Sequence, residues 1–418
     1  MSNGQRPELL SPYRVLDLTD EKGFLCGRLL GDMGADVIKI EKPGGGPGRN
    51  IGPYYHDIPD PEKSLFWFAY NYNKRGITLD IEAAQGQEIF RRLVETADFV
   101  IESFPPGYMD RLGLGYSALS EINPRIIMTS ITPFGQTGPY KDYKGSDLVT
   151  TALGGLLYIT GDDDRPPVRN SVEQSYAQAG VHAAVATMFA HYRRQRSGEG
   201  QHVDVSMQEC VWTAAMVSGV GVSRWRYLGI IPRRAGEKSA YGPVKARHVW
   251  QCKDGYIGWR LYVGLMGNHT SRMVEFMDSE GEAGELKGMN WGEISFDQVD
   301  QQQWDRWEAV FSQFFLTRTK GELLQEAIKR GLILAPVNTP ADLLKHEQLE
   351  YRGFWRSVEH PELGTTITYP GTLYKSSLGS CGIWHPAPLI GEHNEEIYGE
   401  ELGFNEEGIL SLKQGGII

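Results

Sequence analysis

Two basic stretches of the chain carry residue types that could hold a phosphate group. Residues 42–49 read KPGGGPGR, so Lys42 and Arg49 flank glycines whose backbone can approach an anion closely. Lys74 and Arg75 form a second basic pair, directly after an aromatic-dense segment at residues 64–72. A flexible turn accounts for the glycines equally well, so both interpretations stay open. The spacing is not GxGxxG and no helical pattern follows it, which argues against a nicotinamide dinucleotide site.

Cysteine content and charge argue against several other kinds of function. The four cysteines, at positions 26, 210, 252 and 381, form no CxxC pair and show no spacing typical of a metal site. We therefore expect no metal and reduced thiols. The net charge of -11 disfavours a nucleic acid as partner. No apolar run reaches the roughly 18 to 20 residues of a membrane span, and the first ten residues show no signal-peptide pattern. We expect a cytoplasmic protein with no membrane partner.

An alternation of short apolar strands and amphipathic helices must position the basic residues. A strand at 15–18, a helix ending near Gly34 and a strand at 36–41 predict the opening unit of a parallel sheet. Further strands are predicted at 98–102, 126–130 and 202–205, with a helix at 80–96. A long helix is predicted from about residue 172 to Arg194, and its first backbone N–H groups would suit an acyl or anionic ligand. The pattern predicts an α/β fold with a doubly wound, Rossmann-like large domain.

The pattern changes near residue 224, where we expect a second domain to begin. A hairpin is predicted at 249–260, around the Asp254-Gly255 turn, and helices are predicted at 304–315 and 320–330. A strand at 332–337 and a helix at 339–346 follow. We therefore expect residues 1–224 and 332–418 to form the large domain and residues 225–331 a smaller α+β domain.

Nine segments occur in the order characteristic of one protein family. They read VLDLT (15–19), LLGDMGADVIKIEKPGG (29–45), NKRGITLD (73–80), IESFPPGYMDRLGLGY (101–116), NPRIIMTSITPFGQTGPY (123–140), SGEGQHVDVSMQE (197–209), APVNT (335–339), RGFW (352–355) and PAPLIGEHNEE (386–396). Together they resemble the class III CoA-transferases, the formyl-CoA and carnitine CoA-transferase family, which also includes alpha-methylacyl-CoA racemases.

The resemblance implies a two-domain α/β subunit whose large domain includes both the N-terminal half and the C-terminal tail. It also implies a dimer in which two subunits pass through each other like linked rings. Coenzyme A, or its acyl thioester, is then a substrate that lies across the large domain. The positions that match the family's CoA contacts are Lys42, Asn73, Lys74, Arg75 and Arg111 for the nucleotide and Thr132 for the pantetheine or thioester end.

One position departs from the family pattern in a way that changes the chemistry. Family transferases use an aspartate that attacks the acyl-CoA, forms a mixed anhydride and then carries CoA as an aspartyl thioester. This aspartate lies four residues before a helix glycine, and counting back from Gly180 gives Tyr176. A phenol, with a pKa of about 10, cannot become an acyl carrier for CoA. The resemblance therefore implies a subunit without its nucleophile.

Other residues near this position offer only partial substitutes. Glu173 precedes Tyr176 by three residues, which displaces a carboxylate by roughly 5 Å along a helix. The racemase branch pairs a histidine with the same aspartate, and that histidine position here is Ser146, next to Asp147. The small segment after the first strand is replaced by residues 20–25, and the family's glycine-run lid by residues 233–247.

Three hypotheses about function follow from these departures. In the first, the chain is the aspartate-lacking subunit of a heteromeric class III CoA-transferase and needs an aspartate-bearing paralogue as partner, in a heterodimer or an α2β2 assembly. In the second, it is an active transferase that uses Glu173 or other chemistry without an aspartate. In the third, it is a CoA-binding regulatory or scaffold protein.

Overall fold

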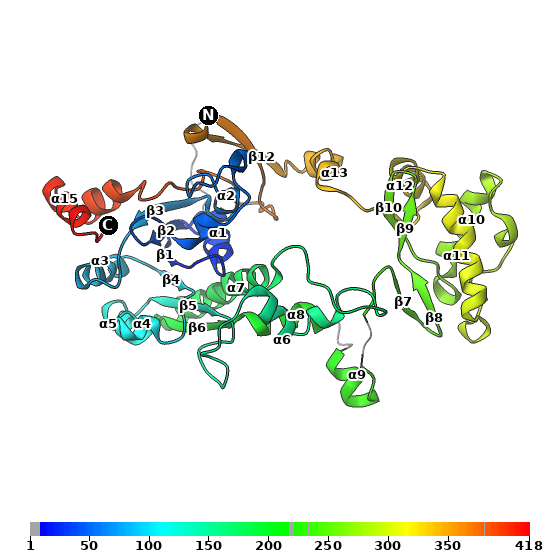
Figure 1. The fold of residues 1–418 in the computed structure, drawn as a ribbon, viewed down its shortest axis with the longest axis horizontal. Coiled ribbons are helices and arrows are strands. Elements are labelled where there is room, and N and C mark those ends of the chain that lie inside the picture. The colour runs from blue at the N-terminus through cyan, green and yellow to red at the C-terminus, as the bar shows by residue number, and fades with distance from the viewer. Residues whose placement is uncertain (1–8, 217–220, 232–233, 380) are drawn as a thin grey trace. The chain divides into compact units, whose positions relative to one another are not determined.

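The computed structural model describes residues 9–216, 221–231, 234–379 and 381–418. These residues form two compact units (Figure 1). Of the described residues, the first unit contains those within 9–156, 170–216 and 347–418, and the second contains those within 157–169 and 221–346. The predicted lid segment 233–247 begins on a residue outside the described ones. No helix among the described residues is long and apolar enough to cross a membrane.

A six-stranded parallel sheet forms the centre of the first unit. Its strands are β1 (Arg14–Leu18), β2 (Asp36–Glu41), β3 (Lys74–Thr78), β4 (Phe99–Glu102), β5 (Ile127–Thr132) and β6 (Gln201–Ser206). The strand order is β3-β2-β1-β4-β5-β6, and every neighbouring pair is parallel. The order reverses between β1 and β4, which is the switch point where open α/β sheets bind ligands.

Helices cover both faces of this sheet. One face packs against α1 (Phe24–Asp32), the long α7 (Gln174–Ser197) and the start of α8 (Met207–Met216). The other face packs against α3 (Ala84–Glu95), α5 (Tyr116–Ile122) and α15 (Glu406–Gln414). Shorter helices in this unit are α2 (Leu65–Asn71), α4 (Tyr108–Arg111), α6 (Asp147–Leu153) and α14 (Glu347–Tyr351). This layering is the predicted doubly wound α/β arrangement.

The strand β3 was not predicted, and it explains how the C-terminal tail attaches. Gly76 and His393 exchange two hydrogen bonds: the Gly76 N–H donates to His393 Nδ1 at 3.2 Å, and the His393 N–H donates to the Gly76 carbonyl at 2.9 Å. Asn394 bonds to both the backbone and the side chain of Thr78. A Cβ on Gly76 would lie 2.8 Å from Pro388. The motifs NKRGITLD and PAPLIGEHNEE are therefore contact partners.

The second unit has its own core and its own small sheets. Strands β9 (Val249–Cys252), β10 (Gly255–Gly258) and β11 (Ala335–Pro336) form one antiparallel sheet, and β7 (Lys238–Tyr241) pairs with β8 (Val244–Arg247). The helices are α9 (Gly221–Leu228), α10 (Gly267–Ser279), α11 (Gln301–Leu316), α12 (Lys320–Arg330) and α13 (Pro340–Leu344). Aromatic side chains fill the core between α11 and the β9-β10 hairpin, where Trp250, Trp259 and Phe315 are in mutual ring contact.

The unit boundaries differ from the expected domain boundaries at two places. Residues 332–346 cluster with the second unit because β11 pairs with β10 instead of joining the large sheet. Residues 157–169 also cluster there, since Lys245 forms an ion pair with Asp163 and the Arg234 side chain donates to the Asp162 carbonyl. Residues 347–418 return to the first unit, where the β12 (Trp355–His360) and β13 (Thr365–Pro370) hairpin lies.

The packing of α7 on α1 gives a testable prediction at Gly180. A Cβ at this position would lie 2.8 Å from Leu25 Cβ and 3.3 Å from the Cys26 backbone nitrogen. Because overpacking a close helix contact is unfavourable, Gly180→Ala should lower the free energy of unfolding by about 1–3 kcal/mol. Gly321→Ala is the control, since nothing lies within 4 Å of its added methyl group, and it should stabilise α12 by up to about 1 kcal/mol. Urea unfolding measures both; equal stabilisation in the two variants would contradict the packing argument.

Candidate active site

A cavity of about 190 Å³ opens at the carboxyl ends of β1, β2 and β4, beside the switch point of the sheet. Asp20 follows β1 and Ser103 follows β4, and both line this cavity. Their side chains connect the two loops: the Asp20 N–H donates to Ser103 Oγ at 2.8 Å, and that hydroxyl donates to Asp20 Oδ1 at 2.8 Å. Sequence reasoning did not select this pair. Their positions directly after adjacent parallel strands were the signal that could have found them.

Two of the predicted CoA residues, Lys42 and Arg111, lie near each other at this carboxyl edge. The Lys42 ammonium forms an exposed ion pair with Glu82 at 3.1 Å. The Tyr108 hydroxyl donates to the same carboxylate, and the Arg111 guanidinium lies 5.7 Å from the Tyr108 ring centre. Tyr108 and Lys42 together hold the pKa of Glu82 below its ordinary value. A single exposed carboxylate therefore links the loop after β2 with α4.

Thr132, the predicted contact for the thioester end, is the last residue of β5 and is fully buried. Its hydroxyl has no hydrogen-bond partner in the part of the chain that the structure describes. Buried hydroxyls in folded proteins are usually paired. The hydroxyl of Thr132 is therefore a donor still available at the carboxyl end of the sheet.

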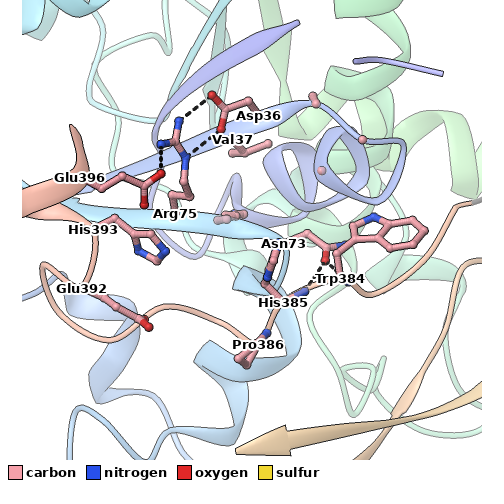
Figure 2. A pocket seen from close by; sticks show the side chains of 14 residues that line it. Asp36, Val37, Asn73, Arg75, Trp384, His385, Pro386, Glu392, His393 and Glu396 are labelled. Carbon is pink, nitrogen blue, oxygen red and sulfur yellow. Dashed lines mark hydrogen bonds and ion pairs between the residues drawn. The ribbon is translucent and has the colours of Figure 1, made fainter. Parts of the chain in front are cut away.

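Asn73 and Arg75 lie at the start of β3, and so at the opposite, amino-terminal edge of the sheet. Figure 2 shows them lining a cavity of about 260 Å³ together with residues of the C-terminal tail. The Arg75 guanidinium binds Asp36 at 2.6 Å and Glu396 at 2.8 Å, while the Asn73 carboxamide accepts from the Trp384 N–H at 2.6 Å. In this structure both side chains hold the tail in place. The strand direction thus separates Asn73 and Arg75 from Lys42 and Arg111.

Lys74 belongs to a fully buried group of charges. Its ammonium donates to Asp17 Oδ2 at 2.8 Å, to the Phe24 carbonyl at 3.0 Å and to Asn71 Oδ1 at 2.9 Å. Lys39 pairs with the other carboxylate oxygen of Asp17, at 3.4 Å. Burial lowers the pKa of Lys74 to about 8, against the opposing effect of the Asp17 carboxylate. This burial argues against direct contact between Lys74 and a phosphate group.

Arg49, the second cation of the glycine-rich stretch, is likewise buried. Its guanidinium binds the Glu41 carboxylate with two nitrogens, at 2.9 and 2.7 Å, and donates to the Pro388 carbonyl at 3.0 Å. It also stacks on Trp67, 3.8 Å from the ring centre. Arg49 therefore joins the loop after β2 to the C-terminal tail, and of the two cations flanking these glycines only Lys42 is exposed to solvent.

Tyr176 lies in the first turn of α7, partly buried and beside α6. Its hydroxyl oxygen accepts from the Asp147 N–H at 3.2 Å. Burial raises the pKa of Tyr176 to about 12; the Asp147 N–H opposes this rise, while the Glu21 carboxylate adds to it. The phenol is neutral at pH 7 and presents no carboxylate at this position.

The first two N–H groups of α7 are already bonded within the chain, whereas the sequence predicted that they would suit an anionic ligand. Asp147 Oδ1 accepts from the N–H groups of Gln174 and Ser175, both at 2.8 Å, and from the Ser175 hydroxyl at 2.9 Å. A carboxylate from α6 therefore caps the helix. Glu173 occupies the residue before α7, and its exposed side chain makes no capping bond to the helix.

The comparisons with known proteins agree with the geometry of the first unit. The family model described as CoA-transferase family III matches residues 10–394. The chain belongs to CoA-transferase family III. It is 36% identical to the BbsE subunit of succinyl-CoA:(R)-benzylsuccinate CoA-transferase from Thauera aromatica, over 98% of both chains. It is 30% identical to succinyl-CoA–D-citramalate CoA-transferase from Chloroflexus aurantiacus, over the full length of both.

A solved structure supports the same family assignment. The CAIB/BAIF family protein from Brucella suis superposes with a TM-score of 0.81 at 28% identity, covering 95% of this chain and 100% of that one. Members of this family act on CoA thioesters. Within the described residues, no group of three or more His, Cys, Asp or Glu side chains is placed to hold a metal ion.

Proposed function

We propose that this chain is the non-catalytic subunit of a heteromeric CoA-transferase of family III. The complete enzyme would move CoA from succinyl-CoA to a carboxylic acid such as (R)-benzylsuccinate, the reaction of anaerobic toluene degradation, in the cytoplasm. One observation carries the proposal: a neutral phenol, Tyr176, stands four residues before Gly180, where the family resemblance predicts the nucleophilic aspartate. Its hydroxyl is bonded to the backbone of Asp147, whose own carboxylate caps α7. The relative from Thauera aromatica, which is named a subunit, supports the heteromeric part.

The surface of α7 supports a partner chain on the first unit. Val181, Val185, Phe189 and Tyr192 are all exposed, and Phe189 exposes 72% of its surface. Their spacing of four, four and three residues places them on one face of the helix, opposite the alanines that pack on the sheet. An exposed apolar face of this kind favours a protein partner. The partner in the proposal is an aspartate-bearing paralogue, interlocked with this chain as a heterodimer or an α2β2 assembly.

The proposed CoA site uses the carboxyl edge of the sheet. Lys42 and Arg111 would contact the nucleotide there, and the free hydroxyl of Thr132 would meet the thioester end. Three further CoA contacts, at Asn73, Lys74 and Arg75, are predicted by the family resemblance alone. The structure adds no support for them, because each of these side chains is bonded to other residues of the chain. CoA would bind to this subunit non-covalently, with no thioester bond between CoA and the chain.

Coexpression tests the proposed assembly. A tagged form of this chain, expressed with the aspartate-bearing paralogue from a neighbouring reading frame, should purify as a fixed-stoichiometry complex of two kinds of chain, measured by native mass spectrometry. Phe189→Asp should reduce the yield of that complex at least about tenfold, since a charge would be buried in an apolar contact. Ile328→Asp, on the exposed surface of the second unit, is the matched control and should leave it unchanged. A stable homodimer with full transferase activity would overturn the proposal.

A further inference from the structure

A third cavity of the first unit is lined by cations and by no carboxylate. Its volume is about 240 Å³, and it lies between the turn after α14, the start of β12 and the loop after β13. Arg352, Arg356 and Lys375 all line it, and none of its lining residues is an aspartate or a glutamate. This concentration of positive charge contrasts with the net charge of -11 of the whole chain.

The three cations differ from the buried and half-buried arginines of the first unit that carboxylates neutralise. Arg14, Arg49 and Arg75 each bind two or more carboxylates. Within the described residues, by contrast, no ion pair and no side-chain hydrogen bond joins Arg352, Arg356 or Lys375 to another side chain. Like charges that face one cavity repel each other, and a cleft lined by one sign of charge concentrates counter-ions.

The Arg356 side chain extends toward the turn that carries Arg352. Gly371 leaves room for its stem, since a Cβ there would lie 3.3 Å from Arg356 Cγ. Its guanidinium bends back toward Gly353, with Nη2 4.0 Å from the position that a Cβ of Gly353 would take. This places the Arg356 head beside Arg352 at the turn. The turn itself requires glycine at position 353, because Gly353 has a φ of +59°, a conformation that other residues rarely adopt.

The remaining lining groups complete a site for an oxyanion. The Ser376 hydroxyl oxygen accepts from the Leu378 N–H at 3.3 Å, which leaves its own proton to donate, and the rings of Phe354 and Tyr374 form apolar walls. The Thr372 hydroxyl is engaged, because it donates to the Cys381 carbonyl. Guanidinium groups match the geometry of phosphate oxygens with paired N–H donors, and hydroxyls add further donors. We propose that this cavity binds the phosphate group of a small molecule, held by Arg352, Arg356 and Lys375. The inference does not rest on the proposed transferase function.

Titration calorimetry with inorganic pyrophosphate at low salt tests this site on the full chain. The intact protein should bind one pyrophosphate at the cavity, with affinity that falls as sodium chloride is raised. The double variant Arg352→Gln/Arg356→Gln should weaken binding at least tenfold, and circular dichroism with a thermal melt should show unchanged folding. Lys141→Gln/Lys144→Gln removes the same charge from an exposed loop elsewhere and should leave the affinity unchanged.

Three outcomes would overturn the proposal. Equal affinity in the arginine double variant and the intact protein would place the anion elsewhere. An equal loss of affinity in the Lys141→Gln/Lys144→Gln control would show that the overall charge of the protein alone attracts pyrophosphate. If the protein binds no pyrophosphate, the proposed phosphate site is wrong. If a complex between subunits then also depends on Arg352 and Arg356, the cavity binds an acidic protein segment instead of a small anion. If Arg352→Gln/Arg356→Gln unfolds, Lys375→Gln alone should still weaken binding severalfold.

Discussion

The chain purified without its partner should transfer CoA at least about 10³-fold more slowly than the assembled enzyme. Loss of a covalent nucleophile removes the step on which the whole reaction depends, and such losses slow other enzymes, subtilisin among them, by about 10⁴- to 10⁶-fold. The same reasoning makes Tyr176→Phe nearly silent in the complex, within about twofold of the unmodified rate. Its hydroxyl accepts one bond, from the Asp147 N–H, and under the proposed function it has no role in transfer.

The measurement is the rate of succinyl-CoA consumption with (R)-benzylsuccinate as acceptor, followed by chromatography. Glu173→Gln serves as the matched test of the other carboxylate near the start of α7, and it should change the rate of the complex by less than about threefold. A more direct check uses the isolated chain incubated with acyl-CoA and then borohydride. Reduction of the Glu173 carboxyl group, detected by mass spectrometry, would contradict the proposal of a non-catalytic subunit and would establish an active transferase instead.

Asp17→Asn should lower the free energy of unfolding by about 3–5 kcal/mol, the largest stability effect expected in this chain. The change leaves Lys39 and Lys74 buried with no carboxylate, and an uncompensated buried charge costs about that much. Burial alone would raise the pKa of Asp17, but the two lysines hold it below its ordinary value. The carboxylate is therefore ionised in the folded chain at neutral pH.

Chemical unfolding monitored by tryptophan fluorescence tests this prediction. Asp60→Asn is the control, because it breaks an exposed pair with Lys63 and should change stability by less than about 1 kcal/mol. The double variant Asp17→Asn/Lys74→Met should be more stable than Asp17→Asn, since it removes one of the two unpaired charges. A double variant less stable than the single one would refute the electrostatic explanation.

The pH dependence of unfolding gives an independent check on Lys74. Its pKa is about 8 in the folded chain against 10.5 in its ordinary state. Between these values the unfolded chain binds more protons than the folded one, so the free energy of unfolding rises with pH. The unmodified protein should gain stability relative to Lys74→Met from pH 8 to pH 9.5. A constant difference across that range would contradict the lowered pKa.

The sequence by itself determined the class of fold, and it predicted a departure at the position of the family's nucleophile. Strands at 15–18 and 36–41 follow from short segments rich in valine, leucine and isoleucine, because a parallel strand is buried on both faces, and the structure places β1 and β2 there. Tyr176 could be found by counting from Gly180, since helical spacing is local. The β9-β10 hairpin was likewise encoded locally, at Asp254-Gly255.

Only the tertiary structure decided which charged residues face solvent. A sequence shows that Lys74 is a cation, but its burial depends on Asp17, 57 positions earlier in the chain. Asn73 bonds to Gly382 across 309 positions, so no local pattern could assign it to the C-terminal tail. Asp147 caps α7 from another helix for the same reason. Local periodicity thus predicts elements, whereas the pairing of charges and caps follows from contacts that exist only once distant segments pack together.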